Sequence, residues 1–274
     1  MSDVLAAIVA HKRREIEQAK LRIGLQEMQK RAADSDEARN FFSAVTRPRQ
    51  QLRVIAEVKK ASPSAGVIRE DFDPVAIART YYENGAAAIS CLTDERYFQG
   101  SLDYIAQIKQ AVPLPVLRKD FIVDLYQVYE ARAAGADAIL LIAECIPYEA
   151  QLLDLLILAT ELKMTTLVEV HDVENLLRVR PHIGFPHPSY TLLGINNRDL
   201  TTMTTNLNHT LRLVDMVENR DILVSESGIR THEDCQRLMA AGIYRVLVGE
   251  HLMRQGDIGK ALRDLIGDGQ LKAG

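Results

Sequence analysis

The sequence predicts an α/β chain of the (β/α)8 class, a TIM barrel with an N-terminal helical extension. Short apolar runs alternate eight times with amphipathic helical patterns, and such alternation implies right-handed crossovers and a parallel sheet. Eight repeats imply closure into a barrel. A doubly wound open sheet is the competing architecture, but it normally shows a Gly-rich first turn such as GxGxxG, which this chain lacks.

The predicted strands are short apolar runs bounded by turn residues, at 52–58, 86–92, 115–119, 136–142, 164–170, 190–195, 221–226 and 244–248. The predicted helices lie between and after them, at 74–84, 102–111, 124–134, 147–162, 172–179, 206–217, 231–241 and 257–266. Three helices end in Asn84-Gly85, Ala134-Gly135 or Ala241-Gly242, which are C-cap signals. The irregular connection is a longer Pro-rich loop at residues 180–190.

Composition predicts one domain over residues 1–274, with residues 1–45 as a helical extension within it. The chain is 47% apolar and 26% charged, which is typical of a globular protein with one large buried core. Apolar residues of the extension, from Val4 to Val9, recur at helical spacing. That spacing alone is typical of a helix that covers the bottom of the barrel.

Charge and hydropathy exclude several partners. No apolar run approaches the roughly 20 residues of a membrane span, and the N-terminus shows no signal-peptide cleavage motif, so we expect a cytoplasmic protein that binds no membrane. The net charge of −4 argues against a nucleic-acid partner, because phosphate backbones demand a broad basic surface. An anionic small molecule stays compatible with the sequence if the cations are local.

Cysteine and histidine spacing predicts no metal and no disulfide. Cys91, Cys145 and Cys235 are odd in number and lie far apart, which favours reduced thiols in the core. The seven histidines show no HxH, HxxxH or HExxH spacing. His171 is therefore interpreted as a loop or helix-start residue rather than a ligand.

The densest group of polar residues is IAEVKKASPSAG, residues 55–66. Alternate residues of a strand share a face, so Glu57 and Lys59 point the same way. The run ends in loop residues, which puts the pair at the carboxyl end of its strand, where barrel enzymes place their reactive groups. A structural ion pair at the rim is the alternative interpretation.

Other polar residues follow the later strands in the same way. They are Lys119, Glu169, Asn196, Arg198, Glu226 and Ser227, and two glycines, Gly228 and Gly249, stand at equivalent strand ends. The carboxyl ends of the strands together form the mouth of the barrel. We expect Arg118 and Asp120 to point away from this mouth, which leaves Lys119 facing inward. Taken alone, Lys119 could instead extend to solvent. Two lysines and three glutamates around one mouth can lower the cost of burial by pairing.

The Ser227-Gly228 turn and Gly249 match the usual phosphate cradle of such barrels, in which backbone N–H groups hold the anion. A plain turn is the alternative for Ser227-Gly228. Glu250 is an awkward neighbour for a phosphate, so we expect its side chain to turn away.

At these residues the chain resembles the indole-3-glycerol-phosphate synthase family. The resemblance rests on seven motifs in order along nearly the whole chain: IAEVKKASPSAG, LTDERYFQGSLDYI, VLRKDFIVD, LLIAE, LVEVHD, GINNRDL and SESGI. It implies a lyase of tryptophan biosynthesis that cyclises 1-(2-carboxyphenylamino)-1-deoxyribulose 5-phosphate with loss of CO2 and water, without a cofactor. The sequence departs from the family pattern in the loop at 180–190 and at Glu250.

The resemblance also implies roles for single residues. Lys119 would be the general acid, Glu169 the general base, and Glu57 with Lys59 a pair that positions substrate and assists dehydration. The implied substrate contacts are Asn196, Glu226, Phe98, Phe121 and Leu140, and the implied phosphate contacts are Ser62, Arg198, Ser227, Gly228 and Gly249. The extension would help to cap the mouth of the active site.

The partner is therefore expected to be a small phosphorylated substrate, bound by a monomer, with weak self-association left open. Three other functions remain on the sequence alone. A Schiff-base aldolase also uses a barrel lysine and a phosphate site. The isomerase that precedes ring closure in tryptophan biosynthesis shares the fold and the phosphate cradle. It ordinarily uses a Cys and an Asp, and no such pair is evident at the predicted strand ends. The third is a barrel that binds a phosphorylated ligand without catalysis.

Overall fold

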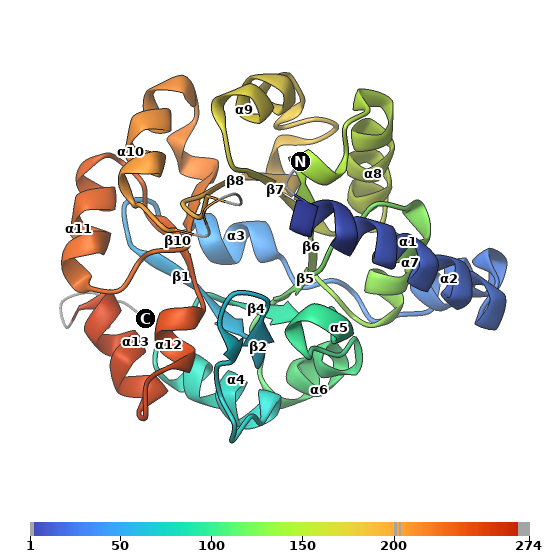
Figure 1. Ribbon diagram of the computed structural model, residues 1–274, viewed down its shortest axis with the longest axis horizontal. Coiled ribbons are helices and arrows are strands. Elements are labelled where there is room, and N and C mark those ends of the chain that lie inside the picture. The colour runs from blue at the N-terminus through green and yellow to red at the C-terminus, as the bar shows by residue number, and fades with distance from the viewer. Residues whose placement is uncertain (1–2, 200–201, 203, 268–274) are drawn as a thin grey trace.

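Eight parallel strands close into a barrel in the order β1-β10-β9-β8-β7-β6-β5-β4 (Figure 1). The structure is a computed structural model that describes residues 3–199, 202 and 204–267. The strands are β1 (Arg53–Val58), β4 (Ala88–Leu92), β5 (Val116–Lys119), β6 (Ala138–Ile142), β7 (Thr165–Val170), β8 (Thr191–Asn196), β9 (Leu223–Glu226) and β10 (Arg245–Val248). The predicted fold class is confirmed, and each strand begins within two residues of its predicted start.

A ring of helices covers the outside of the barrel (Figure 1). They are α4 (Pro74–Glu83), α6 (Asp103–Ala111), α7 (Leu125–Ala133), α8 (Glu149–Glu161), α9 (Val173–Val179), α10 (Asn208–Leu213), α11 (His232–Ala240) and α13 (Ile258–Ile266). Strands covered on both faces need apolar residues throughout, and every residue of β4, β6 and β7 is buried. All eight predicted helices are present.

Local signals account for where these helices start and stop. Side-chain N-caps that accept hydrogen bonds from the first turn are Asp73, Asp124, Asp172, Thr231 and Asp257. The predicted C-cap glycines Gly85, Gly135 and Gly242 have φ values of 90°, 92° and 83°, which L side chains rarely adopt.

The structure contains short elements that periodicity did not predict. These are the hairpin β2 (Ala61–Ser62) and β3 (Gly66–Val67), the helices α5 (Glu95–Phe98) and α12 (Glu250–Met253), and the 3-10 turns η1 (Ala143–Cys145), η2 (Arg180–His182), η3 (Pro188–Tyr190), η4 (Val214–Met216) and η5 (Arg220–Ile222). Pieces of two to four residues are too short to show a helical or strand period.

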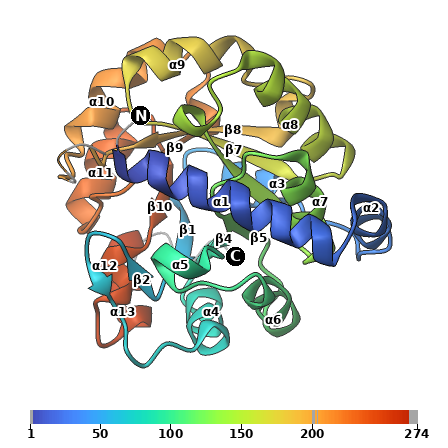
Figure 2. The same cartoon turned by 45° about the vertical axis from the view of Figure 1, so that its right-hand side comes forward.

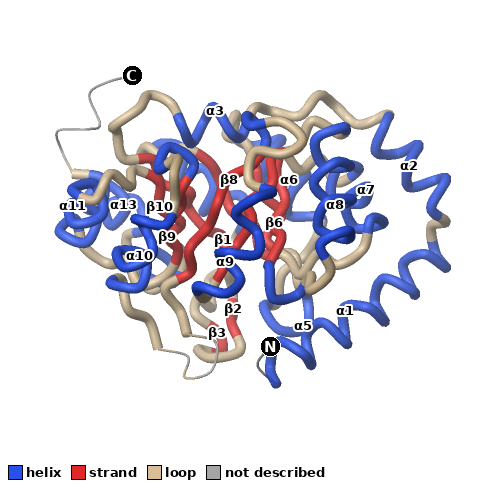
Figure 3. The backbone as a smooth tube through the Cα atoms, turned by 90° about the horizontal axis from the view of Figure 1, so that it is seen from above, coloured by secondary structure: helices blue, strands red, loops and turns tan. Residues whose placement is uncertain are grey.

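The N-terminal extension breaks into three helices that reach both ends of the barrel. They are α1 (Asp3–Arg22), α2 (Leu25–Ala33) and α3 (Phe41–Thr46). In the side view, α1 lies at the same end as β2 and β3, whereas α3 lies at the opposite end (Figure 3). Figure 2 shows α1 running across the barrel. The apolar residues that suggested a helix at the bottom of the barrel, Val4 to Val9, lie in α1 at the pocket end, so that interpretation was wrong for them. The helix at the opposite end is α3, which the spacing did not single out.

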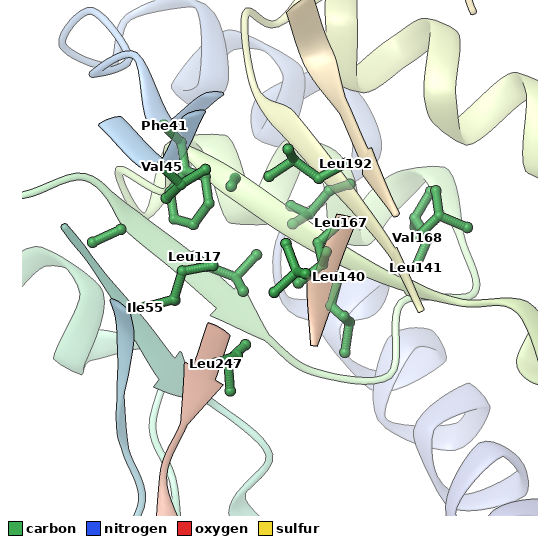
Figure 4. Close-up of a cluster of buried hydrophobic side chains, with 14 of the residues drawn as sticks. Phe41, Val45, Ile55, Leu117, Leu140, Leu141, Leu167, Val168, Leu192 and Leu247 are labelled. Carbon is green, nitrogen blue, oxygen red and sulfur yellow. The ribbon is translucent and has the colours of Figure 1, made fainter. Parts of the chain in front are cut away.

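The helix α3 contributes to the core. Its Phe41 and Val45 are fully buried and lie beside barrel residues such as Leu117 and Leu192 (Figure 4). Cys91, Cys145 and Cys235 are free and buried, which confirms the prediction of core thiols. Among the described residues, no helix has the length and apolarity needed to cross a bilayer.

Candidate active site

All fourteen site residues predicted from the sequence line one pocket of about 500 Å³ at the carboxyl ends of the strands. They are Glu57, Lys59, Ser62, Phe98, Lys119, Phe121, Leu140, Glu169, Asn196, Arg198, Glu226, Ser227, Gly228 and Gly249. Val4, Leu5 and Ile8 of α1 also line it. The convergence follows from topology, because strands that run parallel in a closed barrel all end at the same rim.

Lys119 is the last residue of β5 and faces the pocket. Its Nζ lies 2.7 Å from Glu169 Oε2 and 3.5 Å from Glu226 Oε2. Arg118 points away, as predicted, and binds Asp120 and Glu130. Asp120, which was also expected to point away, is among the residues that line the pocket, and it binds Lys12 of α1. Burial alone lowers the pKa of Lys119, but the nearby carboxylates, Glu169 foremost, outweigh it and raise that pKa above its usual range, so the side chain is an ammonium.

The two glutamates beside Lys119 have opposite protonation tendencies. Burial raises the pKa of Glu169, but the charges of Lys119 and His171 outweigh burial, and its net pKa is lowered. Burial and the charge of Glu169 together raise the pKa of Glu226 well above its usual range. Asn196 donates from Nδ2 to Glu169 Oε1 at 3.1 Å. The pocket thus holds an ionised carboxylate, suited to act as a base, beside a carboxyl that favours its neutral form.

Glu57 and Lys59 form the predicted ion pair, with 2.6 Å between Nζ and Oε1. A methyl group added at Gly249 would lie 2.8 Å from Cδ of Glu57 and overlap its Oε1. Likewise, a methyl at Gly194 in β8 would overlap Oε1 of Glu226. Gly249, predicted only as a phosphate contact, therefore also leaves the space that the Glu57 carboxylate occupies. Gly194 was not singled out in the sequence.

One wall of the pocket is apolar. The rings of Phe98 and Phe121 have centroids 6.0 Å apart and an interplanar angle of 41°, and Leu140 beside them in the lining is buried. Tilted aromatic rings at this distance pack favourably with a further ring. The wall suits an aromatic group in the substrate.

A second group of lining residues comprises the predicted phosphate contacts. Ser227 and Gly228 have φ values of 67° and 76°, so two consecutive residues adopt the left-handed region. Asn197 donates from Nδ2 to the Ser227 carbonyl at 3.1 Å and fixes this turn. Consecutive backbone N–H groups in such turns form anion-binding concavities. Ser62 lines the same pocket from β2.

The expectation that Glu250 turns away from the phosphate contacts was wrong. Its Oε2 lies 2.9 Å from Nη2 of Arg198, and its Oε1 accepts hydrogen bonds from Arg254 at 2.9 and 3.0 Å. The reason is charge pairing: the first turn of α12 places the carboxylate between two guanidinium groups. Glu250 therefore occupies part of the guanidinium of Arg198 that was predicted to contact a phosphate.

His171 is the pocket residue that sequence reasoning set aside. It lines the pocket, with its imidazole between Glu144 and Glu169. The overlooked signal is spacing, because His171 is two residues beyond Glu169 and alternate strand residues share a face. Thr205, Arg230, His251 and Arg254 also line the pocket and were not predicted.

Comparison with known proteins identifies the family. A family model described as indole-3-glycerol phosphate synthase matches residues 5–265. A protein of that name from Acidithiobacillus ferrooxidans is 50% identical over 270 residues, which cover 98% of this chain and all of the relative. Its namesake from Rhodopirellula baltica is 52% identical over 235 residues, or 86% of this chain and 88% of the relative.

Solved structures at low identity support the fold alone. The 3-hexulose-6-phosphate synthase from Salmonella typhimurium is 12% identical, with a TM-score of 0.59 over 78% of this chain and 97% of its own. A mutant tryptophan synthase alpha-subunit from Pyrococcus furiosus is also 12% identical, with a TM-score of 0.56 over 80% of this chain and 98% of its own. With the family model matched over nearly its whole length, the chain belongs to the indole-3-glycerol phosphate synthase family, whose members are decarboxylating lyases of tryptophan biosynthesis.

Proposed function

We propose that this pocket closes the indole ring of 1-(2-carboxyphenylamino)-1-deoxyribulose 5-phosphate with Lys119 as general acid and Glu169 as general base. The observation that carries the proposal is the position of the Lys119 ammonium, held 2.7 Å from an ionised carboxylate on the floor of a half-apolar pocket. An acid and a base side by side, with no room between them for bulk solvent, suit a reaction that needs both in sequence.

The pocket offers one region for each part of the substrate. The aromatic ring is placed against the wall of Phe98, Phe121 and Leu140. The phosphate is assigned to the proposed contacts Ser62, Arg198, Ser227, Gly228 and Gly249. Asn196 and Glu226, which also line the pocket, are assigned to the hydroxyl groups or the anthranilate carboxylate.

Ring closure needs a positive charge at the ketone. The aromatic carbon that bears the carboxylate attacks the ketone carbon, and the developing alkoxide takes a proton from Lys119. The carboxylate then leaves as CO2, and the electrons of the broken carbon–carbon bond restore the aromatic ring. Lys119 supplies the charge from within apolar walls, where an ion pair or hydrogen bond is stronger than in water.

Dehydration needs an acid and a base together. The new hydroxyl group leaves as water after protonation, and Glu169 removes a proton from the neighbouring carbon of the new ring, which forms the double bond of the indole. Glu57 with Lys59 is proposed to assist this step and to position the substrate. The net reaction takes up one proton, because a carboxylate leaves as neutral CO2.

The first test replaces the proposed acid. Lys119→Met should lower kcat by about 10²-fold or more, the usual effect of general acid catalysis, while KM for the substrate changes little. Fluorescence of the indole product measures turnover. Lys163→Met is the control, because Lys163 lies on the surface, outside the pocket lining, and pairs with the exposed Glu37. Turnover close to that of the unaltered protein would remove Lys119 from the role of acid.

Borohydride trapping and the assay for indole product together separate two of the alternative functions. A Schiff-base aldolase would be trapped on Lys119 by borohydride in the presence of substrate, whereas the ring closure proposed here forms no bond to the enzyme. A barrel that only binds a phosphorylated ligand would bind the substrate and form no product.

Further expectations concern the whole chain: one domain over residues 1–274, a cytoplasmic location, a monomer, and neither cofactor nor metal. They stay predictions, and residues 1–2 and 268–274 of the domain lie outside the described residues. Analytical ultracentrifugation of the purified chain tests the assembly.

A further inference from the structure

The imidazole of His171 is held at both ends by carboxylates from different elements. Its Nδ1 lies 3.2 Å from Oε2 of Glu144, and its Nε2 lies 3.3 Å from Oε1 of Glu169. The other oxygen of Glu144 accepts the backbone N–H of His171 at 3.0 Å. Glu144 belongs to η1, which follows β6, so the contact joins the ends of two neighbouring strands.

All three side chains are nearly inaccessible to solvent, at 8% for Glu144, 7% for His171 and 3% for Glu169. A neutral imidazole has one donor and one acceptor nitrogen, so it would face one of the two carboxylates with an acceptor. The imidazolium donates to both. The geometry therefore favours the charged ring at neutral pH.

The groups around His171 agree with this assignment. Burial lowers its pKa, but the hydrogen bond to Glu144 and the charge of Glu169 raise it more, and the net pKa lies above that of a free histidine. Lys119 acts in the opposite direction from β5. His209 of α10 faces the backbone of His171, and its own pKa is lowered, chiefly by burial.

We propose that His171 is a positioning residue for the base Glu169, and that Glu144 holds His171 in the orientation and charge this role requires. The inference rests on the proposed role of Glu169. Oε2 of Glu169 contacts Lys119, whereas Oε1 receives Asn196 and His171. When Lys119 gives its proton to the substrate, it no longer holds a positive charge against Glu169. His171 is then the cation that keeps Glu169 ionised and oriented.

The first variant removes the charge of His171. In His171→Gln, the pKa of Glu169 rises because an adjacent cation is lost, so the acid limb of kcat moves to higher pH by about one to three units. That limb reports the coupled pair Glu169 and Glu226 rather than one residue. KM should change little, because His171 contacts the base and is not assigned to the substrate.

The second variant gives a different profile. Glu144→Gln lowers the pKa of His171, but His171 is still protonated in acid, so the acid limb stays in place. Activity should instead fall above the lowered pKa of His171, to the level that His171→Gln shows at the same pH, because the ring is then neutral and no longer orients Glu169. The double variant should keep the pH profile of His171→Gln, because the effect of Glu144 on the charge next to Glu169 passes through the imidazole. NMR titration of the ring, assigned by its loss in His171→Gln, measures the pKa directly.

A matched control exists outside the pocket. His182 and Glu149 also pair, with Nε2 and Oε1 3.0 Å apart, and Glu149→Gln should leave both limbs unchanged. If His171→Gln and Glu144→Gln keep the parental pH profile while Glu169→Gln is inactive, the inference fails and the base assignment stands. If Glu169→Gln turns over normally, the proposed function fails first. A fall in kcat without any shift of either limb would make the His171 contact merely structural and also overturn the inference.

Discussion

At the scale of single residues, the site depends on glycines as well as on its charged side chains. Gly249 and Gly194 pack directly against the carboxyl groups of Glu57 and Glu226, with no room for a methyl group. The carboxylates are thus placed by close packing as well as by ion pairs. A glycine can therefore affect catalysis without contacting the substrate.

Gly249→Ala separates the two possible roles of this glycine. The methyl would lie 3.0 Å from Cβ and 2.8 Å from Cδ of Glu57, so the carboxylate must leave the position in which it pairs with Lys59. We expect kcat to fall by about 10²-fold, the cost of a displacement of roughly 1 Å in an active site. Steady-state kinetics measures it. Adding Glu57→Asp, which shortens the side chain, should restore part of kcat.

Gly256→Ala is the control for that experiment, because a methyl group there meets no atom within 4 Å. If Gly249→Ala raises KM and leaves kcat unchanged, Gly249 serves the phosphate rather than Glu57.

Glu250→Gln should strengthen substrate binding. The change removes a carboxylate that competes with phosphate for Arg198 and keeps the shape of the side chain. We expect KM to fall by about two- to fivefold, since partly exposed ion pairs are worth about 0.2–1 kcal/mol. Inhibition by inorganic phosphate should strengthen by a similar factor. A higher KM would mean that Glu250 orients Arg198 for the phosphate.

At the scale of elements, α1 is tied to the barrel by one buried lysine. Lys12 Nζ lies 2.9 Å from Asp94 and 3.0 Å from Asp120, which follow β4 and β5. The hydroxyl of Tyr126 adds hydrogen bonds to the carbonyls of Ala19 and Ile23. Since Asp120 follows Lys119, the helix that lines the mouth is anchored next to the proposed acid.

Lys12→Met should destabilise the protein by about 3–5 kcal/mol, because it leaves the buried Asp94 without its cation and leaves Asp120 paired with Arg118 alone. Lys20→Met is the matched control on the same helix. Lys20 is 34% exposed and binds Glu17 and Asp124, so its loss should cost less than about 1 kcal/mol. Urea unfolding measures both. Equal losses would show that Lys12 is no special anchor.

The stability that Lys12 contributes through Asp120 should decrease as the pH falls. Burial raises the pKa of Asp120, but the charges of Arg118 and Lys12 outweigh it and hold the pKa of this carboxyl well below its usual range. A depressed folded-state pKa contributes stability above the unfolded value, and that stability is lost as the pH falls. The stability difference between the parent and Lys12→Met should therefore narrow below about pH 4.

At the scale of the whole molecule, the N-terminal extension connects the two ends of the barrel. Its α1 lines the mouth, while α3 buries Phe41 and Val45 at the other end. Between them, Arg39 donates to the carbonyls of Lys109, Val112 and Leu114 at 2.7–2.8 Å. One segment thus lines the pocket at its start and packs into the core at its end.

Two truncations separate these contributions. Deleting residues 1–34 should leave a barrel that unfolds cooperatively, with a higher KM because the α1 part of the pocket is gone. Deleting residues 1–46 also removes Phe41, whose loss from a core costs about 3–5 kcal/mol by itself, so this form should unfold at a much lower temperature. Thermal unfolding and substrate titration compare the two. Equal melting temperatures would contradict a structural role for α3.

The barrel fold, and the residues that line the pocket at its mouth, could be predicted from the sequence alone. Strand and helix periods are local, so every barrel strand and outer helix could be predicted. Because parallel strands end at one rim, residues as far apart as Glu57 and Gly249 could be expected in one pocket. Alternation within a strand also predicted that Lys119 points inward and Arg118 outward.

Only the tertiary structure decided how these residues interact. The contacts of His171 with Glu144 and of Glu250 with Arg198 cross between elements, and their distances depend on how short loops pack. Whether Glu169 or Glu226 is the ionised carboxylate depends on burial and on the position of one lysine. Periodicity fixes the face on which a residue lies, whereas charge state and close packing depend on distances of a few ångströms that only the folded chain sets.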